Sequence, residues 1–296
     1  AALREAVAAD VVEELDDQPG RFQFTHALIP QTIAQELSTT DRVRKHAEIA
    51  RKMEAMYGDD SDEHASELAE HYAEAEILLG SEDLVRYSRI AGEAALAAYD
   101  FHSAHLHFTR ALSTMAPDQD PAESAPLLFG LAQAQLATLE RRNMPEAVTT
   151  LGQAFELFLE VGDTDAAVRV AATEIPSVYG NEAGADLLAR ALDIEPIDPS
   201  IKARILSRQG VVLHLGSGDT EQALRTQNEA LTIAREIGDE RIEFGILVNT
   251  GFIAGRHGRS SVFRTAIDRA LEFSDRVDIP RASARTHFYA SLIKAT

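Results

Sequence analysis

Histidine forms the densest group of residues in this chain that could do chemistry. His102, His105 and His107 lie in one stretch, 101–115, that is predicted to be a helix. Residues three apart share a helix face, so His102 and His105 could ligate a metal together, whereas His107 points elsewhere. The stretch is also the second helix of a sequence repeat, where such positions are usually solvated. We therefore favour a solvated helix and predict no metal site.

A second pair of histidines, His64 and His71, lies seven residues apart, with Glu67 and Glu70 nearby. The order of these residues is not the His-Glu-x-x-His of zinc proteases. We interpret this segment as the surface of a helix as well.

Carboxylate pairs such as Asp59-Asp60, Glu13-Glu14 and Asp16-Asp17 fall in turns and at helix ends. General acid–base catalysis needs carboxylates in a cleft with shifted pKa values, so solvated charge is the better interpretation of these pairs.

The segment 216–220, Gly-Ser-Gly-Asp-Thr, lacks the strand and the lysine of a phosphate-binding loop. It is predicted to be a turn with Asp219 as the next helix's N-cap. No catalytic residue and no cofactor is therefore predicted, and the chain is expected not to be an enzyme.

Composition excludes further functional classes. The 296 residues contain no Cys, so disulfides and thiol catalysis are excluded, and the formal net charge is −20. So acidic a chain is a poor candidate for binding nucleic acid directly. There is neither an apolar run of about 20 residues, which a membrane span needs, nor a signal peptide. A cytoplasmic protein is expected. Because the chain begins Ala1-Ala2 and ends in a helical pattern, we interpret it as a fragment of a longer protein.

Internal sequence repeats indicate how the helices that carry these residues are arranged. The segments 160–163 and 236–239 nearly repeat each other, and alanines recur 43, 37, 39 and 40 residues apart at Ala111, Ala154, Ala191, Ala230 and Ala270. A recurring unit of this size built from helix pairs is typical of a solenoid, and solenoids are mostly binding surfaces.

The helical periodicity predicts six helix pairs and a truncated seventh that begins near residue 281. The pairs are 41–57 with 62–79, 82–98 with 101–115, 122–140 with 145–161, 163–179 with 182–194, 199–215 with 219–237, and 239–256 with 260–276. Residues 1–16 are predicted to be a helix, 21–25 the chain's one convincing strand, and 26–38 a helix. Domains are predicted at 1–40 and 41–296.

The spacing of small and bulky residues resembles that of tetratricopeptide repeats from about residue 82 onward. Gly92, Ala104, Phe108 and Ala111 match the pattern. Three further sets match with one departure each, and in the set around Ala223 and Ala230 Gln227 occupies the bulky position while Gly210 is one residue out of register. The resemblance implies an all-α, right-handed solenoid of helix hairpins.

A second pattern covers the N-terminal third, with residues in 22–29, at Ile33, in 36–38, in 42–46, in 67–72 and in 91–95. This pattern resembles the junction in STAND-type signalling ATPases, which include regulators similar to the maltose-regulon activator and cyclase-fused relatives. It implies that 1–40 is the tail of a winged-helix-like module, a helix plus a β-hairpin, between an ATPase and a helical sensor. The P-loop of that family is absent, so no ATP-binding residue is assigned.

The first helices of such repeats usually line the concave surface. Six polar residues fall near inward positions and form the predicted binding site: Arg86, Arg89, Arg204, Arg208, Asn249 and Arg256. Arginines there would favour an acidic peptide or a small anionic ligand, although ion pairs within and between helices are the favoured interpretation. The predicted function is a non-catalytic protein- or ligand-binding sensor or scaffold of a bacterial signal-transduction ATPase or transcriptional regulator, which could form homo-oligomers. A stand-alone protein–protein adaptor and an enzyme built on helical repeats remain the alternatives.

Overall fold

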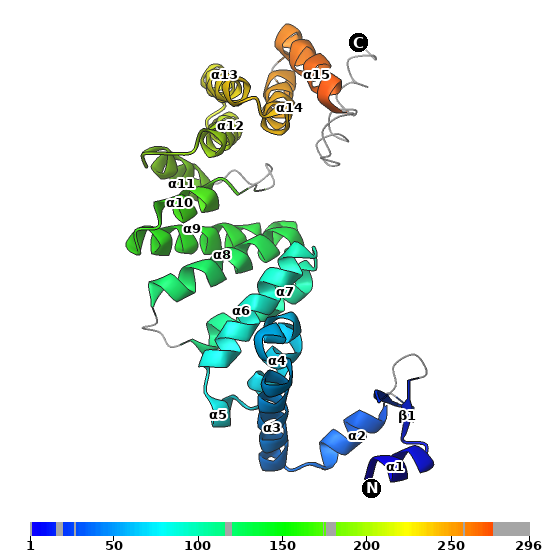
Figure 1. The fold of residues 1–296 in the computed structure, drawn as a ribbon. Helices are drawn as coiled ribbons and strands as arrows, with labels where there is room; N and C mark the ends of the chain where they lie inside the picture. Colours follow the sequence, from blue (N-terminus) through cyan, green and yellow to red (C-terminus); the bar gives the residue numbers. More distant parts are fainter. Residues whose placement is uncertain are drawn as a thin grey trace. The chain divides into compact units, whose positions relative to one another are not determined.

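The computed structural model describes residues 2–15, 20–26, 28–115, 120–173, 175, 182–256 and 258–274. Within these residues the chain is helical except for one short hairpin near the N-terminus (Figure 1). The chain divides into two compact units, Ala1–Ala91 and Gly92–Thr296, each of which is described by itself below.

The first unit begins with a short helix and a β-hairpin and continues as helices. Its elements are α1 (Ala2–Ala8), β1 (Val12–Glu14), β2 (Phe22–Phe24), α2 (Leu28–Glu36), α3 (Thr39–Tyr57), the 3₁₀ segment η1 (Gly58–His64), α4 (Ala65–Glu74), α5 (Glu76–Leu79) and the start of α6 (Glu82–Ala97). The loop predicted at 58–61 is part of η1, so the second helix of this pair starts later than the expected residue 62.

The predicted helix over residues 1–16 is too long, because its second half contains the strand β1, for which the sequence has no convincing strand signal. The helix ends at Ala8, and Val12 pairs with Phe24 in an antiparallel hairpin. Asp10 has a φ of 58°, a left-handed conformation that ends the helix. The β-branched valine gains a cross-strand partner in the hairpin, which local helical periodicity does not register. A helix followed by a β-hairpin nevertheless agrees with the form expected for the N-terminus.

A shared carboxylate joins three helices of the first unit. Glu54 of α3 accepts hydrogen bonds of 2.7 Å from the hydroxyls of Tyr72 on α4 and Tyr87 on α6. The two rings stack with centroids 5.5 Å apart, and both side chains are buried. Burial, reinforced by the hydrogen bond to Glu54, raises the pKa of Tyr87 to about 12. This cluster fixes α3, α4 and α6 against one another.

The second unit is a succession of helices. After the end of α6 come α7 (Phe101–Thr114), α8 (Pro121–Thr138), the 3₁₀ turn η2 (Arg141–Asn143), α9 (Met144–Glu160), α10 (Thr164–Ala171), α11 (Glu182–Leu192), α12 (Pro199–Gly216), α13 (Thr220–Ile237), α14 (Glu240–Arg256) and α15 (Ser260–Ser274).

Most predicted helix pairs of this unit agree with these bounds. The clear exception is 163–179, because α10 already ends at Ala171. Pro176 follows in the sequence, and the residue before a proline disfavours helical backbone angles. The predicted seventh pair lies outside the described residues.

Helices of the second unit pack in chain order. From α7 to α15 each helix contacts the next one, and contacts that skip one helix join α9 to α11, α10 to α12 and α12 to α14. This pattern is that of a helical repeat, in which each unit touches only its neighbours. The expectation of helices stacked in series is therefore confirmed for this unit.

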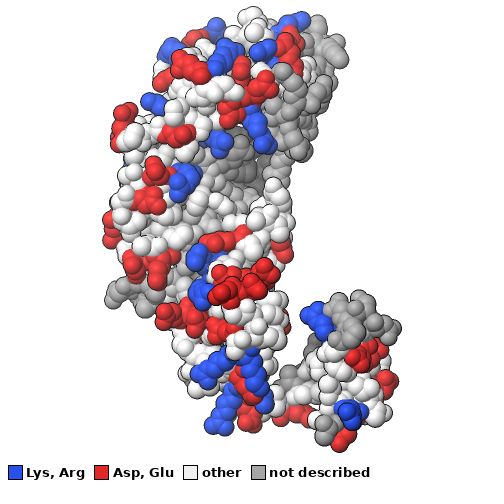
Figure 2. All heavy atoms as spheres, viewed as in Figure 1, with Lys and Arg blue, Asp and Glu red and all other residues white. Residues whose placement is uncertain are grey.

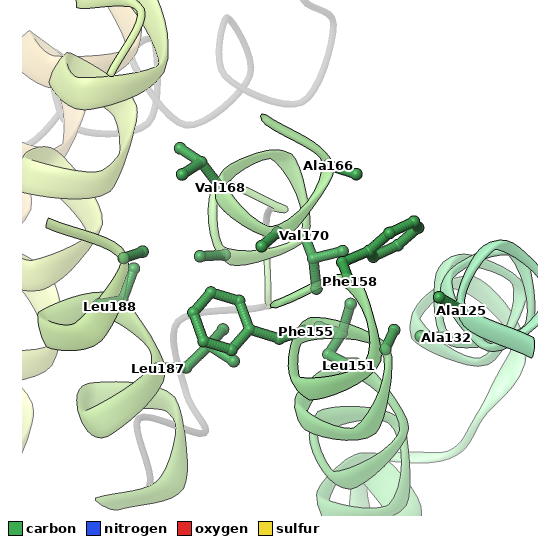
Figure 3. Close-up of a cluster of buried hydrophobic side chains, with 14 of the residues drawn as sticks. Ala125, Ala132, Leu151, Phe155, Phe158, Ala166, Val168, Val170, Leu187 and Leu188 are labelled. Carbon is green, nitrogen blue, oxygen red and sulfur yellow. The ribbon is translucent and has the colours of Figure 1, made fainter. Parts of the chain in front are cut away.

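The core of the second unit is a chain of clusters rather than one centre. One cluster takes buried residues from α8 through α12, and in it Phe155 of α9 points toward Leu187 and Leu188 of α11 (Figure 3). A further cluster joins α12, α13 and α14, and another joins α14 to α15. Each hairpin therefore buries its apolar side against its neighbours.

The spacing of small and bulky residues corresponds to direct contacts. A Cβ on Gly92 or on Gly130 would meet the ring of Phe108, and a Cβ on Gly251 would lie 2.5 Å from Ile267. A Cβ on Gly210 would lie 2.7 Å from the amide of Gln227. In its repeat the polar Gln227 therefore takes the position that Phe108 and Ile267 take in theirs, opposite a glycine of the preceding helix. Gly210 makes this contact although it is one residue out of register in the sequence pattern.

Candidate functional site

Two of the six predicted site residues lie in the first unit. Arg86 forms an ion pair with Asp62 at 3.0 Å, and its guanidinium lies 4.8 Å from the centre of the Tyr87 ring. Arg89 is half-buried on the same helix, α6. The structure therefore gives Arg86 a role in holding α6 against η1.

The other four lie on α12 and α14 of the second unit, and Arg208 has a structural role there. Its Nη1 donates to the carbonyl oxygens of Ala171, at 2.8 Å, and Thr173, at 2.6 Å. These carbonyls belong to the end of α10, where the last turn of a helix lacks intrahelical partners. Arg208, on α12, thus caps the C-terminal end of α10. This contact holds the hairpin that begins with α10 against the next hairpin, which begins with α12.

Asn249 belongs to a polar network that joins three helices. Its Nδ2 donates to Ser207 Oγ at 3.1 Å, and that hydroxyl donates to Gln227 Oε1 at 2.9 Å. Gln227 Nε2 donates in turn to the carbonyl of Ser207 at 2.6 Å. Ser207 and Gln227 are buried, and a satisfied buried network specifies one arrangement of α12, α13 and α14.

A stripe of residues runs along α14 on the side of Asn249. Gly245, Asn249, Phe252 and Arg256 are spaced four, three and four residues apart, which places them on one helix face. Phe252 meets the buried His214 of α12 edge to face with centroids 5.6 Å apart, and Arg256 lies 5.8 Å from the Phe252 ring centre. Arg256 and, on α12, Arg204 are exposed.

A pocket lies between α10 and α12. Its volume is about 220 Å³, and its lining residues are Asp165, Val168, Arg169, Pro196, Ile197, Asp198 and Ile201. Val168 is buried, whereas Asp165 and Arg169 are exposed at the rim. Hydrogen bonds from Ser200 and Ile201 hold the pKa of the Asp198 carboxyl below its usual range, so that carboxylate is ionised at neutral pH.

The pocket, the Arg208 cap and the Asn249 network follow one another across α10, α12 and α14. These helices are the first members of successive hairpins. We use the name first-helix surface for six residues of these three helices, Asp165, Arg169, Arg204, Arg208, Asn249 and Arg256. Four of them are predicted site residues on α12 and α14, whereas Arg86 and Arg89 lie in the other unit.

Sequence reasoning missed the pocket. Its lining comes from α10 and from a loop and helix more than twenty-five residues later, so no local motif marks it. Asp198 had a detectable signal, because an aspartate before Pro199 at a helix start is a typical N-cap. That signal indicates a helix start rather than a binding site.

The histidines separate in the structure. His102 is exposed, His105 is half-buried and His107 is buried, so the three do not share one solvated face. His64 stacks on Tyr57, while His71 meets His46 of α3 with their Nδ1 atoms 2.9 Å apart. Among the described residues no group of three or more potential ligands could hold a metal ion.

The visible charges of the second unit are mixed. Figure 2 shows basic and acidic side chains interspersed over its helices rather than gathered in one area of a single sign. Within the part of the chain that the structure describes, no helix has the length and hydrophobicity to cross a membrane.

Comparisons with known proteins give one structural similarity of note. A solved structure described as a Rap protein complexed with competence and sporulation factor has a TM-score of 0.49 to this chain at 14% identity, covering 86% of this chain and 78% of its own. No family model matches the chain, and no curated protein matches it. We therefore base the functional proposal on this chain's own contacts.

Proposed function

We propose that this chain is a non-catalytic binding module that holds a protein or peptide partner on its first-helix surface. The observation that carries the proposal is the serial packing of α10, α12 and α14, with a pocket between α10 and α12 and exposed polar side chains beside it. Repeat proteins of this kind present extended surfaces to their partners, and a rigid scaffold keeps such surfaces pre-organised.

A small anionic ligand is the weaker candidate for this surface. Arg208 already donates to two backbone carbonyls, and Arg86 of the first unit already pairs with Asp62. Of the six predicted residues, Arg204 and Arg256 are the exposed cations on α12 and α14 that such a ligand could use. The pocket is also smaller than the roughly 300 Å³ at which pockets for small molecules usually begin.

At a finer level, we propose that the module is the sensor or scaffold of a bacterial signalling ATPase or transcriptional regulator. This rests on the resemblance of the N-terminal third to the STAND junction. In this proposal the N-terminal hairpin is a winged-helix remnant, and the repeats wind into a right-handed, concave solenoid. Partner binding would shift the regulator between two states if the partner prefers one of them. A cytoplasmic location follows from the same proposal.

A stand-alone adaptor is the alternative, and the complete gene distinguishes the two. A Gly-x4-Gly-Lys-Ser/Thr motif upstream in the same reading frame supports the regulator. A complete gene without that motif leaves the binding module in place and removes the signalling role.

The binding proposal is tested by selecting peptides from a displayed random library and measuring their affinity by calorimetry. Arg256→Ala and Gly245→Trp both alter the first-helix surface, and a Cβ at Gly245 meets no atom within 4 Å, so its side chain projects into open space. We expect each change to weaken binding at least about fivefold, the effect typical of an interface residue that matters.

The matched control is Arg225→Ala, the same truncation at an exposed position of the second helix α13. It is expected to leave the affinity unchanged. The proposal fails if no peptide is selected, or if selected peptides lose affinity with Arg225→Ala and not with the two first-helix variants.

A further inference from the structure

The pocket between α10 and α12 is smaller than a typical site for a small molecule. Its volume is about 220 Å³, below the range of roughly 300–1,000 Å³ that holds a drug-sized ligand. Tight protein interfaces commonly place one anchor side chain in such a recess. The pocket therefore suits one residue of an extended peptide better than a free small molecule.

Its lining combines apolar and charged side chains. Val168, Ile197 and Ile201 supply aliphatic surface, while the carboxylates of Asp165 and Asp198 and the guanidinium of Arg169 also line it. A lysine or arginine side chain matches this combination, because its methylene stem packs on apolar surface while its charged end stays near water.

The lining itself has more acidic than basic side chains. Asp165 and Asp198 outnumber Arg169 in it, and the charge of Arg204, from outside the lining, acts on Asp198. Asp165 is therefore the carboxylate available to a cationic anchor, and the whole chain carries a formal net charge of −20. Such a chain attracts cationic segments over distance. The Asp198 carboxylate is held in place by the backbone N–H groups of Ser200 and Ile201, so one negative charge is pre-organised at the pocket.

We propose that this pocket takes the lysine or arginine side chain of an extended basic peptide. The aliphatic stem lies against Val168 and Ile201, and the cationic end lies near Asp165. Arg169, one turn along α10 from Asp165, donates to a backbone carbonyl of the bound segment. The inference rests on the proposed binding function and specifies the chemistry of the partner.

The test uses the whole chain and three short fluorescein-labelled glycine–serine peptides with central Lys-Leu-Lys, Glu-Leu-Glu or Ser-Leu-Ser. Binding is followed by fluorescence anisotropy at low salt and at about 0.15 M ionic strength, where charges are screened beyond about 8 Å. We expect the lysine peptide to bind more tightly than the other two, with part of its preference retained at the higher salt.

Two variants locate the site. Asp165→Asn is expected to weaken binding of the lysine peptide about three- to fivefold, the scale of one exposed ion pair. Ile197→Trp narrows the pocket and is expected to weaken both the lysine and the serine peptide. Circular dichroism verifies that both variants keep the helical content of the parent.

Asp268→Asn is the matched control, because it removes the same charge at an exposed position on α15. It is expected to leave the lysine peptide's affinity within error of the parent. Equal losses with Asp165→Asn and Asp268→Asn would show that only net charge matters and would overturn the inference, as would preferential binding of the glutamate peptide.

The two proposals fail separately. If library-selected peptides bind the first-helix surface but Asp165→Asn and Ile197→Trp leave their affinity unchanged, the pocket inference fails and the binding function stands. If no peptide binds the parent chain at all, the binding function itself fails.

Discussion

His46 and His71 show how a single contact can link stability to pH. Their Nδ1 atoms lie 2.9 Å apart, so one ring must donate and the other accept, which requires at least one neutral imidazole. Burial, together with the charge of His46, lowers the pKa of His71, while Glu67 and Glu70 act in the opposite direction. An ion pair between Arg42 and Glu74 joins the same two helices at 3.3 Å.

We expect the first unit to lose stability as the pH falls below about 6.5, the ordinary histidine pKa. Because the folded pKa of His71 is lowered, the unfolded chain binds more protons in that range, so acid favours unfolding. Urea denaturation at a series of pH values measures the effect. His71→Gln should flatten this dependence, whereas His102→Gln, at an exposed position, should not; parallel curves for parent and His71→Gln would contradict the assignment.

At the scale of elements, aspartate caps and glycine contacts define the hairpins. Asp100, Asp163 and Asp219 each accept a hydrogen bond from a backbone N–H in the first turn of the helix they precede. These starts are readable in the sequence because capping is a local interaction. Close packing of two helices depends instead on what lies opposite each glycine, as with Phe108 between Gly92 and Gly130.

Two glycine-to-alanine changes should have opposite effects. Gly130→Ala places a methyl group in the ring of Phe108 and is expected to destabilise the second unit by about 1–3 kcal/mol through overpacking. Gly152→Ala, in α9, meets no atom within 4 Å and is expected to stabilise by about 0.5–1 kcal/mol through lower backbone entropy in the unfolded chain. Chemical denaturation measures both, and destabilisation of equal size would refute the packing argument.

At the scale of the whole molecule, burial is distributed unevenly along the chain. Among the described side chains of residues 2–36 none is buried, whereas α8 and α9 supply many fully buried residues to one cluster. Local opening therefore costs little free energy near the N-terminus and much more in the middle of the second unit.

Hydrogen–deuterium exchange followed by mass spectrometry should reveal this difference. We expect amides of α1 and α2 to exchange within the shortest labelling time and those of α8 and α9 to be the most protected, because their opening disrupts the largest cluster. Equal protection of α1 and α9 would show that the N-terminal segment has stability that these contacts do not explain.

The sequence by itself determined the helix pairs, their caps and the alanine–bulky spacing, because each depends on residues within one or two turns. It did not determine the strand at Val12–Glu14, the end of α10 at Ala171, or the contacts that the predicted arginines make. The strand and the arginine contacts depend on partners beyond one or two helical turns: Val12 pairs with Phe24, and Arg208 donates to the carbonyls of Ala171 and Thr173.

The tertiary structure alone decided where the pocket lies. The pocket exists because Val168 and Ile201, more than thirty residues apart, face each other when first helices of successive hairpins pack side by side. Periodicity predicts that such helices will meet, but the volume left between them depends on the side chains and on the loop at Pro196–Asp198. That loop has no helical period from which its path could be predicted.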